Sequence, residues 1–93
     1  MIGSFGTRET EQVWRGLRSR RLPDDVQRIG LRKLELIAAA AGIDDLCIPP
    51  GNRLEMLKGD LKGFWSIRIN QQWRIIFRWV NGNAEDVEII DYH

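Results

Sequence analysis

Residues 63–78 read Gly-Phe-Trp-Ser-Ile-Arg-Ile-Asn-Gln-Gln-Trp-Arg-Ile-Ile-Phe-Arg, and they predict two β-strands joined by a turn at Asn70, Gln71 and Gln72. Side chains of a strand alternate between the two faces of a sheet. One face would carry the aromatic and aliphatic residues Trp65, Ile67, Ile69, Trp73, Ile75, Phe77 and Trp79. The reverse face would carry Phe64, Ser66, Arg68, Arg74, Ile76 and Arg78. The first face is suited to covering a core, and the second to presenting cations.

The residues before this pair predict two helices. A short strand is expected at residues 1–5, and Thr7 is a good N-cap for a helix that should end by Ser19. After a basic segment that ends at Pro23, a second helix should begin at Asp24, with Gln27 three residues later as in a capping box. Gly42 is expected to end this helix after about 18 residues.

The remaining segments predict further strands. An extended pattern begins at Asn52 and is broken at Gly59-Asp60, and Asn81-Gly82-Asn83 is a strong hairpin signal. The alternation after the hairpin continues to the last residue. We therefore expect one α+β domain over residues 1–93, with two N-terminal helices packed on one face of a small antiparallel sheet.

Composition narrows the class of protein. The sequence has no apolar run of the roughly 18 residues that span a membrane, and no signal-peptide pattern is visible. The single cysteine, Cys47, excludes an internal disulfide and fits a reducing cytoplasm; we expect it to serve as a small apolar side chain rather than as a catalytic thiol. With one histidine and one cysteine, a zinc site is not expected, and we predict no metal or other cofactor.

Charge is unevenly distributed although the net charge is only +1. Residues 1–33 hold eight Lys or Arg and four Asp or Glu, and residues 53–78 hold six and two. Residues 34–52 and 79–93 contain Asp and Glu but no Lys or Arg, and the second segment ends in the histidine. Clustered charge sets the local potential even when the total is small, so the first third and the central strands are the candidate surfaces for a polyanion.

Three groups of residues could carry chemistry. The basic residues of the predicted sheet are Arg53, Lys58, Lys62, Arg68, Arg74 and Arg78. They form either a solvated face or a set of phosphate ligands, for which arginine offers a fixed fork of donors. Asp91-Tyr92-His93 ends the chain, and His93 would supply an imidazole that titrates near neutral pH if the last strand holds it. Glu55 is either an ion-pair partner or a proton carrier.

Three motifs together resemble the HigB toxins, a branch of the RelE/ParE toxin superfamily. They are Asn52-Arg-Leu-Glu-Met-Leu-Lys-Gly-Asp60, Gly63-Phe-Trp-Ser-Ile-Arg-Ile-Asn-Gln-Gln-Trp-Arg-Ile-Ile-Phe77, and the terminal Asp91-Tyr-His93. The resemblance covers essentially the whole chain and implies the same fold. It also implies a ribosome-dependent mRNA endonuclease acting in the ribosomal A site, neutralised by a helix-turn-helix antitoxin of the HigA type. The toxin alone is expected to be a monomer, and its complex a higher-order assembly.

The resemblance also implies where the active site lies. Carried onto this chain, the family's catalytic positions are Lys58, Arg74, Asp91, Tyr92 and His93. Some members have a histidine where this chain has Glu55, which we add to the catalytic set as a carboxylate in its place. The remaining cations Arg53, Lys62, Arg68 and Arg78 are assigned to RNA binding.

Cleavage of RNA without a metal requires a base for the 2′-OH, cations for the phosphorane and an acid for the 5′ oxygen. We assign charge stabilisation to Arg74 with Lys58, and the roles of base and acid to Glu55 and His93 in either order. Tyr92 would orient or stack on a base, and Asp91 would fix His93 or Tyr92. Three alternatives remain at this level: a module that blocks its target by binding alone, a weakened toxin, and a gyrase inhibitor of the ParE type.

Overall fold

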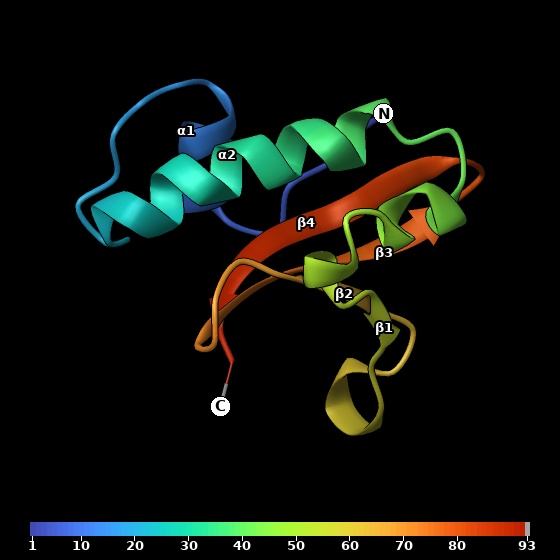
Figure 1. Ribbon diagram of the computed structural model, residues 1–93. Helices are drawn as coiled ribbons and strands as arrows, with labels where there is room; N and C mark the ends of the chain where they lie inside the picture. Colours follow the sequence, from blue (N-terminus) through green and yellow to red (C-terminus); the bar gives the residue numbers. More distant parts are fainter. Residues whose placement is uncertain (93) are drawn as a thin grey trace.

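The computed structural model of the protein describes residues 1–92, and His93 lies outside the described residues (Figure 1). Two α-helices precede four strands that follow one another in the order β1-β2-β3-β4, and each strand is antiparallel to the next. The elements are α1 (Arg8–Trp14), α2 (Asp24–Ala39), β1 (Glu55–Met56), β2 (Trp65–Arg68), β3 (Trp73–Val80) and β4 (Asn83–Asp91). The expected α+β fold, with its helices on one face of a meander, is confirmed.

The predicted apolar face of the sheet covers the core. Ile67, Ile75 and Phe77 have no exposed surface and pack with Leu34 and Ile37 of α2. Trp65, Trp73 and Trp79 border this cluster, as the alternation predicted. Both helices contact β4, and α2 also contacts β3, so the helical layer lies over this face alone (Figure 1).

The reverse face of the sheet carries buried apolar residues as well as cations. Ile76 and Leu57 are buried, yet neither belongs to the main core cluster. Ser66 on the same face has no exposed surface. The cations of this face therefore share it with buried side chains and do not form an open polar surface.

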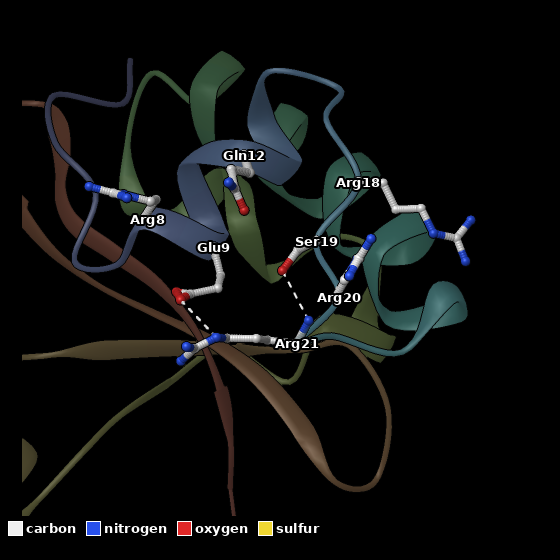
Figure 2. A pocket seen from close by; sticks show the side chains of 7 residues that line it. All are labelled: Arg8, Glu9, Gln12, Arg18, Ser19, Arg20 and Arg21. Carbon is white, nitrogen blue, oxygen red and sulfur yellow. Dashed lines mark hydrogen bonds and ion pairs between the residues drawn. The ribbon is translucent and has the colours of Figure 1, made fainter.

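The first helix begins as predicted and ends early. The Thr7 hydroxyl accepts a hydrogen bond from the Thr10 N–H, which is the expected N-cap. The helix was expected to end by Ser19, and α1 ends at Trp14, because Gly16 takes a left-handed conformation (φ 77°) that a helix cannot continue through. Residues 15–23 form an irregular elbow between the helices (Figure 2).

The second helix begins at Asp24 as predicted, but Gln27 does not complete a capping box. Its side chain instead holds the elbow: Nε2 donates to the carbonyl oxygens of Ser19 (2.7 Å) and Leu22 (2.6 Å), and Oε1 accepts from the Ser19 N–H (2.9 Å). The helix ends at Ala39, before the predicted Gly42.

The segment between α2 and β2 is less extended than predicted. Two 3₁₀ turns, Ile43–Cys47 and Pro50–Asn52, precede β1, and a third, Gly59–Leu61, follows it. The strand expected from Asn52 is therefore reduced to two residues, because Arg53 takes a left-handed conformation (φ 47°) before it. Cys47, expected to serve as a small apolar side chain, is exposed, and Leu46 is the buried residue there.

The two hairpin turns form where they were expected. In the first, Asn70 Oδ1 accepts from the N–H groups of Gln72 (2.8 Å) and Trp73 (2.7 Å). In the second, Asn81 and Gly82 both have positive φ, as a type I′ turn requires. The last strand ends at Asp91, one residue before the end of the described chain.

The N-terminal residues lie along β4 in parallel. Ile2 forms a bridge with Ala84 and Phe5 with Val87, so the strand predicted there appears as two isolated bridges. Within residues 1–92, no helix is long and apolar enough to cross a membrane.

Candidate active site

The register of the sheet brings Arg74, Ser66 and Glu55 together on the reverse face. Glu55 of β1 pairs with Ser66 of β2, and Ser66 pairs with Ile76 of β3. Arg74 lies two residues before Ile76 and so points to the same face, as the diagonal neighbour of Ser66. Three strands therefore contribute one side chain each to the site.

Arg74 is held in place by hydrogen bonds from one of its nitrogens. Nη1 donates to Glu55 Oε1 at 3.0 Å and to Ser66 Oγ at 3.1 Å. The Arg74 side chain is 17% exposed and that of Glu55 is 50% exposed. Within residues 1–92, Nε and Nη2 of Arg74 form no hydrogen bond, so the guanidinium keeps donors that could face an anion.

The end of the chain reaches the same place. The guanidinium of Arg74 lies 5.2 Å from the centroid of the Tyr92 ring, within the range of a cation–π contact. The backbone holds Tyr92 there, because its N–H donates to the carbonyl oxygen of Gln72 at 2.7 Å. The structure thus brings Glu55, Arg74 and Tyr92 together.

Asp91, the residue before Tyr92, does not contact Arg74 and is bound by Gln72 instead. Asp91 Oδ2 accepts from Gln72 Nε2 at 3.0 Å, and Asp91 pairs with Trp73 across the sheet. Neighbouring residues of a strand point to opposite faces, so Asp91 is on the side away from Arg74. His93, predicted as an acid or base, lies outside the described residues.

Three of the predicted cations lie on the turns around β1. Arg53 ends the 3₁₀ turn before β1, Lys58 precedes the turn after it, and Lys62 ends that turn. All three are exposed, and none forms a side-chain hydrogen bond or ion pair within residues 1–92. They are therefore available to a ligand. Lys58 follows Glu55 by three residues in the sequence.

Arg68 and Arg78, the other two residues predicted to bind RNA, form hydrogen bonds within the protein. Arg78 forms an ion pair with Asp86, to which its Nε donates at 2.9 Å, and its guanidinium lies 6.0 Å from the Phe64 ring. Asp86 has positive φ at the register shift between β3 and β4, so a β-bulge turns it toward Arg78. Arg68 Nε donates to the carbonyl oxygen of Asn70 at 3.1 Å and thereby closes the β2–β3 turn.

One residue of the site was missed in the sequence. Ser66 was placed on the correct face, but it was given no role because a lone serine in a strand carries no signature. Its signal is positional: it is a polar residue on an alternating strand, two places before an arginine on the same face.

Glu88 lies farther along the same face, opposite Ile76. Burial raises the pKa of the Glu88 carboxyl above its ordinary value, and the neighbouring charge of Asp86 raises it further. Within the described residues, no group of three or more histidine, cysteine, aspartate or glutamate side chains is placed to hold a metal ion.

This geometry suits the binding of a phosphate group. A largely buried guanidinium fixed by a carboxylate and a hydroxyl keeps its remaining donors in a set orientation. The Glu55 carboxylate and the Tyr92 ring both contact this guanidinium, so a proton acceptor and an aromatic surface lie next to the cation.

Known proteins resemble this chain along most of its length. A family model described as the RelE-like toxin of the type II toxin–antitoxin system HigB matches residues 5–93. Toxin HigB-1 of Vibrio cholerae serotype O1 is 52% identical over 67 residues, which are 72% of this chain and 70% of the toxin. Endoribonuclease HigB of Proteus vulgaris is 38% identical over 98 aligned positions that cover all of both chains.

Solved structures agree with the fold. A YafQ mutant from E. coli superimposes with a TM-score of 0.66 at 12% identity, covering 98% of this chain and 93% of that one. The YoeB–YefM complex from Staphylococcus aureus contains a chain with a TM-score of 0.63 at 15% identity, covering 100% of this chain and 98% of that one. With the match of the family model over residues 5–93, the chain belongs to the HigB-like family of RelE-like toxins of type II toxin–antitoxin systems.

Proposed function

We propose that this toxin is a ribosome-dependent endoribonuclease that cleaves mRNA with Arg74 at the centre of its active site. The observation that carries the proposal is the fixation of Arg74 by Glu55 and Ser66, with Tyr92 beside it. The relative from Proteus vulgaris is named an endoribonuclease, which supports the same class of reaction.

The reaction proceeds by transfer within the RNA chain. A base accepts the proton of a ribose 2′-OH, the 2′ oxygen forms a bond to the adjacent phosphorus, and the bond from phosphorus to the 5′ oxygen breaks. An acid then protonates that oxygen, which leaves a 2′,3′-cyclic phosphate and a 5′-OH end. Arg74 and Lys58 stabilise the charge that develops on the phosphorane oxygens.

Proton transfer is assigned to Glu55 and His93. Glu55 lies against Arg74, so its carboxylate would be next to the phosphate that Arg74 binds. His93 follows Tyr92 in the chain and would supply the second group. Asp91 would fix His93 or Tyr92: its carboxylate accepts from Gln72 Nε2, and the carbonyl oxygen of Gln72 accepts from the Tyr92 N–H.

Substrate RNA is held by aromatic stacking and by charge. Tyr92 offers its ring to a base, as is common for single-stranded RNA. The exposed cations Arg53 and Lys62 contact phosphates, and Arg68 and Arg78 add charge while their donors serve Asn70 and Asp86.

The partners follow from this assignment. The toxin acts in the cytoplasm on mRNA in the ribosomal A site, as a monomer. A helix-turn-helix antitoxin of the HigA type binds it and forms a higher-order complex. That the YoeB structure is a complex with YefM supports an antitoxin partner in general.

Mapping of RNA 5′ ends after induction tests the proposal. The wild-type chain is expected to produce new 5′ ends inside codons of translated messages, and Arg74→Ala is expected to produce none while it still binds the antitoxin. Arg32→Ala, which removes an exposed arginine of α2, serves as a control of equal charge change. Growth inhibition without new RNA ends would overturn the proposal, and in that case a gyrase cleavage assay would identify a ParE-type activity.

A further inference from the structure

Tyr92, the last described residue of the candidate site, lies beyond the end of the sheet. Strand β4 ends at Asp91, and the pair that Asp91 forms with Trp73 lies at the end of the β3–β4 ladder. Residues beyond the last pair of a sheet separate readily from it unless another contact holds them. The place of the Tyr92 ring beside Arg74 therefore depends on what anchors this end of the chain.

Gln72 binds this end of the chain at two points. Its carbonyl oxygen accepts from the Tyr92 N–H at 2.7 Å, and its side-chain Nε2 donates to Asp91 Oδ2 at 3.0 Å. Any residue could provide the first contact, whereas the second requires a side chain with a donor that reaches Asp91. The neighbouring Gln71 is also exposed, but its side chain forms no hydrogen bond within residues 1–92. Of these two glutamines, only Gln72 anchors the end of the chain through its side chain.

The turn that carries Gln72 is itself fixed by side chains. Asn70 Oδ1 accepts from the N–H groups of Gln72 (2.8 Å) and Trp73 (2.7 Å). Arg68 Nε donates to the carbonyl oxygen of Asn70 at 3.1 Å. An asparagine that binds the backbone two residues later holds a turn by local contacts alone. Gln72 therefore grips the end of the chain from a backbone that is already fixed.

This anchor is separate from the contacts that fix Arg74. Arg74 Nη1 donates to Glu55 on β1 and to Ser66 on β2. Gln72 instead binds the last residue of β4 and the residue after it. Two different sets of hydrogen bonds thus hold the two halves of the cation–π contact between Arg74 and Tyr92. Loss of the Gln72 side chain should move the ring and leave the guanidinium in place.

We propose that Gln72 is a positioning residue whose side-chain amide anchors Asp91 and thereby keeps the Tyr92 ring in the site. Neighbouring residues of an extended chain point to opposite faces, so the amide holds the chain from one face while the ring serves the site on the other. The anchoring is a property of the fold, whereas its effect on catalysis rests on the proposed function. Separate measurements test the two.

Tyr92 is the only tyrosine of the chain, so its ring can be observed by itself. Protein labelled with fluorotyrosine gives one fluorine NMR signal, and its displacement from the signal of the urea-unfolded chain reports how far the ring is ordered. The variants are Gln72→Ala, which removes the donor, Gln72→Lys, which keeps a donor of similar reach, and the matched control Gln71→Ala. Urea denaturation verifies that each variant is folded, and single-turnover cleavage on programmed ribosomes measures the rate.

Without the donor, the end of the chain should loosen. The fluorine signal of Gln72→Ala should move toward that of the unfolded chain, and the signals of Gln72→Lys and Gln71→Ala should stay near the wild-type position. The cleavage rate of Gln72→Ala should fall by about tenfold, because a hydrogen bond to a charged group contributes roughly this factor to the anchored population. Gln72→Lys should recover most of the rate, which it would not do if the substitutions only weakened the turn.

Three results would overturn the inference. An unchanged fluorine signal in Gln72→Ala would show that the main-chain bond of Tyr92 is sufficient to hold the ring. An equal displacement in Gln71→Ala would assign the effect to the turn as a whole. A displaced signal with a wild-type cleavage rate would show that the reaction does not need the anchored ring. If the wild-type chain cleaved no RNA while the signals moved as expected, the anchoring would stand and the proposed function alone would be contradicted.

Discussion

Arg74 Nη1 donates to Ser66 Oγ at 3.1 Å, and this serine has no exposed surface. A buried hydroxyl at this distance orients a guanidinium without being able to reach a substrate. Ser66 is therefore a positioning residue for Arg74, and the direction of the free Arg74 donors depends on it.

We expect Ser66→Ala to lower kcat by about tenfold, which corresponds to about 1.4 kcal/mol, with little change in KM. The reason is that Arg74 would keep its charge and its contact with Glu55 but lose one of its two hydrogen bonds. Cleavage kinetics on mRNA-programmed ribosomes measure the effect. Ser66→Thr retains the hydroxyl and should recover most of the rate; wild-type activity in Ser66→Ala would refute the positioning role.

Asn52 ties the segment before β1 to the second helix. Its Nδ2 donates to the carbonyl oxygens of Leu46 (3.1 Å) and Ile48 (3.4 Å), and its Oδ1 accepts from Lys33 Nζ. Asn52→Ala would leave these groups without partners in a site that is fully buried, so we expect a loss of about 1–3 kcal/mol in the free energy of unfolding. Urea denaturation measures it, with the exposed Gln71→Ala as the control. A loss below about 0.5 kcal/mol would show that water replaces the side chain.

Thr10 joins the first helix to the last strand. Its Oγ1 accepts from the Ile89 N–H at 2.9 Å, and the threonine has no exposed surface. Thr10→Val has nearly the same shape but cannot accept this bond, so unfolding free energy should fall by about 1–3 kcal/mol. Thr10→Ser keeps the hydroxyl and should be less destabilised in the same denaturation experiment. A Thr10→Val variant as stable as the wild type would show that this hydrogen bond contributes little to the free energy of unfolding.

Glu88 predicts a pH dependence of stability. Burial raises its pKa in the folded state above the ordinary value of 4.5, so the folded state binds more protons than the unfolded one in the interval above pH 4.5. Stability contributed by this group is complete below that interval and is lost as pH rises through the folded pKa. Glu88→Gln should therefore equal the wild type most closely near pH 4 and exceed it in stability at pH 7.

Chemical denaturation between pH 4 and pH 8 measures this difference. Glu35→Gln, on the exposed side of the second helix, controls for the removal of one negative charge. Parallel stability curves for Glu88→Gln and wild type would show that the carboxyl is not responsible.

Local patterns predicted the sheet well because its signals lie within each segment. The alternation of Ile67, Ile75 and Phe77 identified the buried face, and Asn81-Gly82 identified the hairpin, since both depend only on neighbours in the chain. The N-cap at Thr7 was predictable for the same reason. The ends of the helices were less so, because the left-handed Gly16 and the packing of the elbow ended α1 earlier than its apolar spacing indicated.

Of the residues predicted for the site, the structure brings Glu55, Arg74 and Tyr92 together, whereas Asp91 lies on the other side of the sheet. Glu55 and Arg74 meet across 19 residues, and this depends on the register of β1, which three 3₁₀ turns around it determine. Gln27 matched the spacing of a capping box, but its side chain binds the elbow instead. It donates to the carbonyl oxygens of Ser19 and Leu22, since backbone carbonyl groups away from water require a hydrogen-bond donor. The fixation of Arg74 by Glu55 and Ser66 does not follow from spacing along the chain.

The most direct test of the account is the single-turnover rate of mRNA cleavage on programmed ribosomes for Arg74→Ala, Arg74→Lys and Arg32→Ala. Arg74→Ala is expected to lose on the order of 10²–10³ in rate, since a fixed cation at the phosphorane is removed. Arg74→Lys should recover only part of this rate because an ammonium cannot reproduce the guanidinium fork, and Arg32→Ala should cleave at the wild-type rate. Cleavage by Arg74→Ala at the rate of Arg32→Ala would contradict the central role of Arg74.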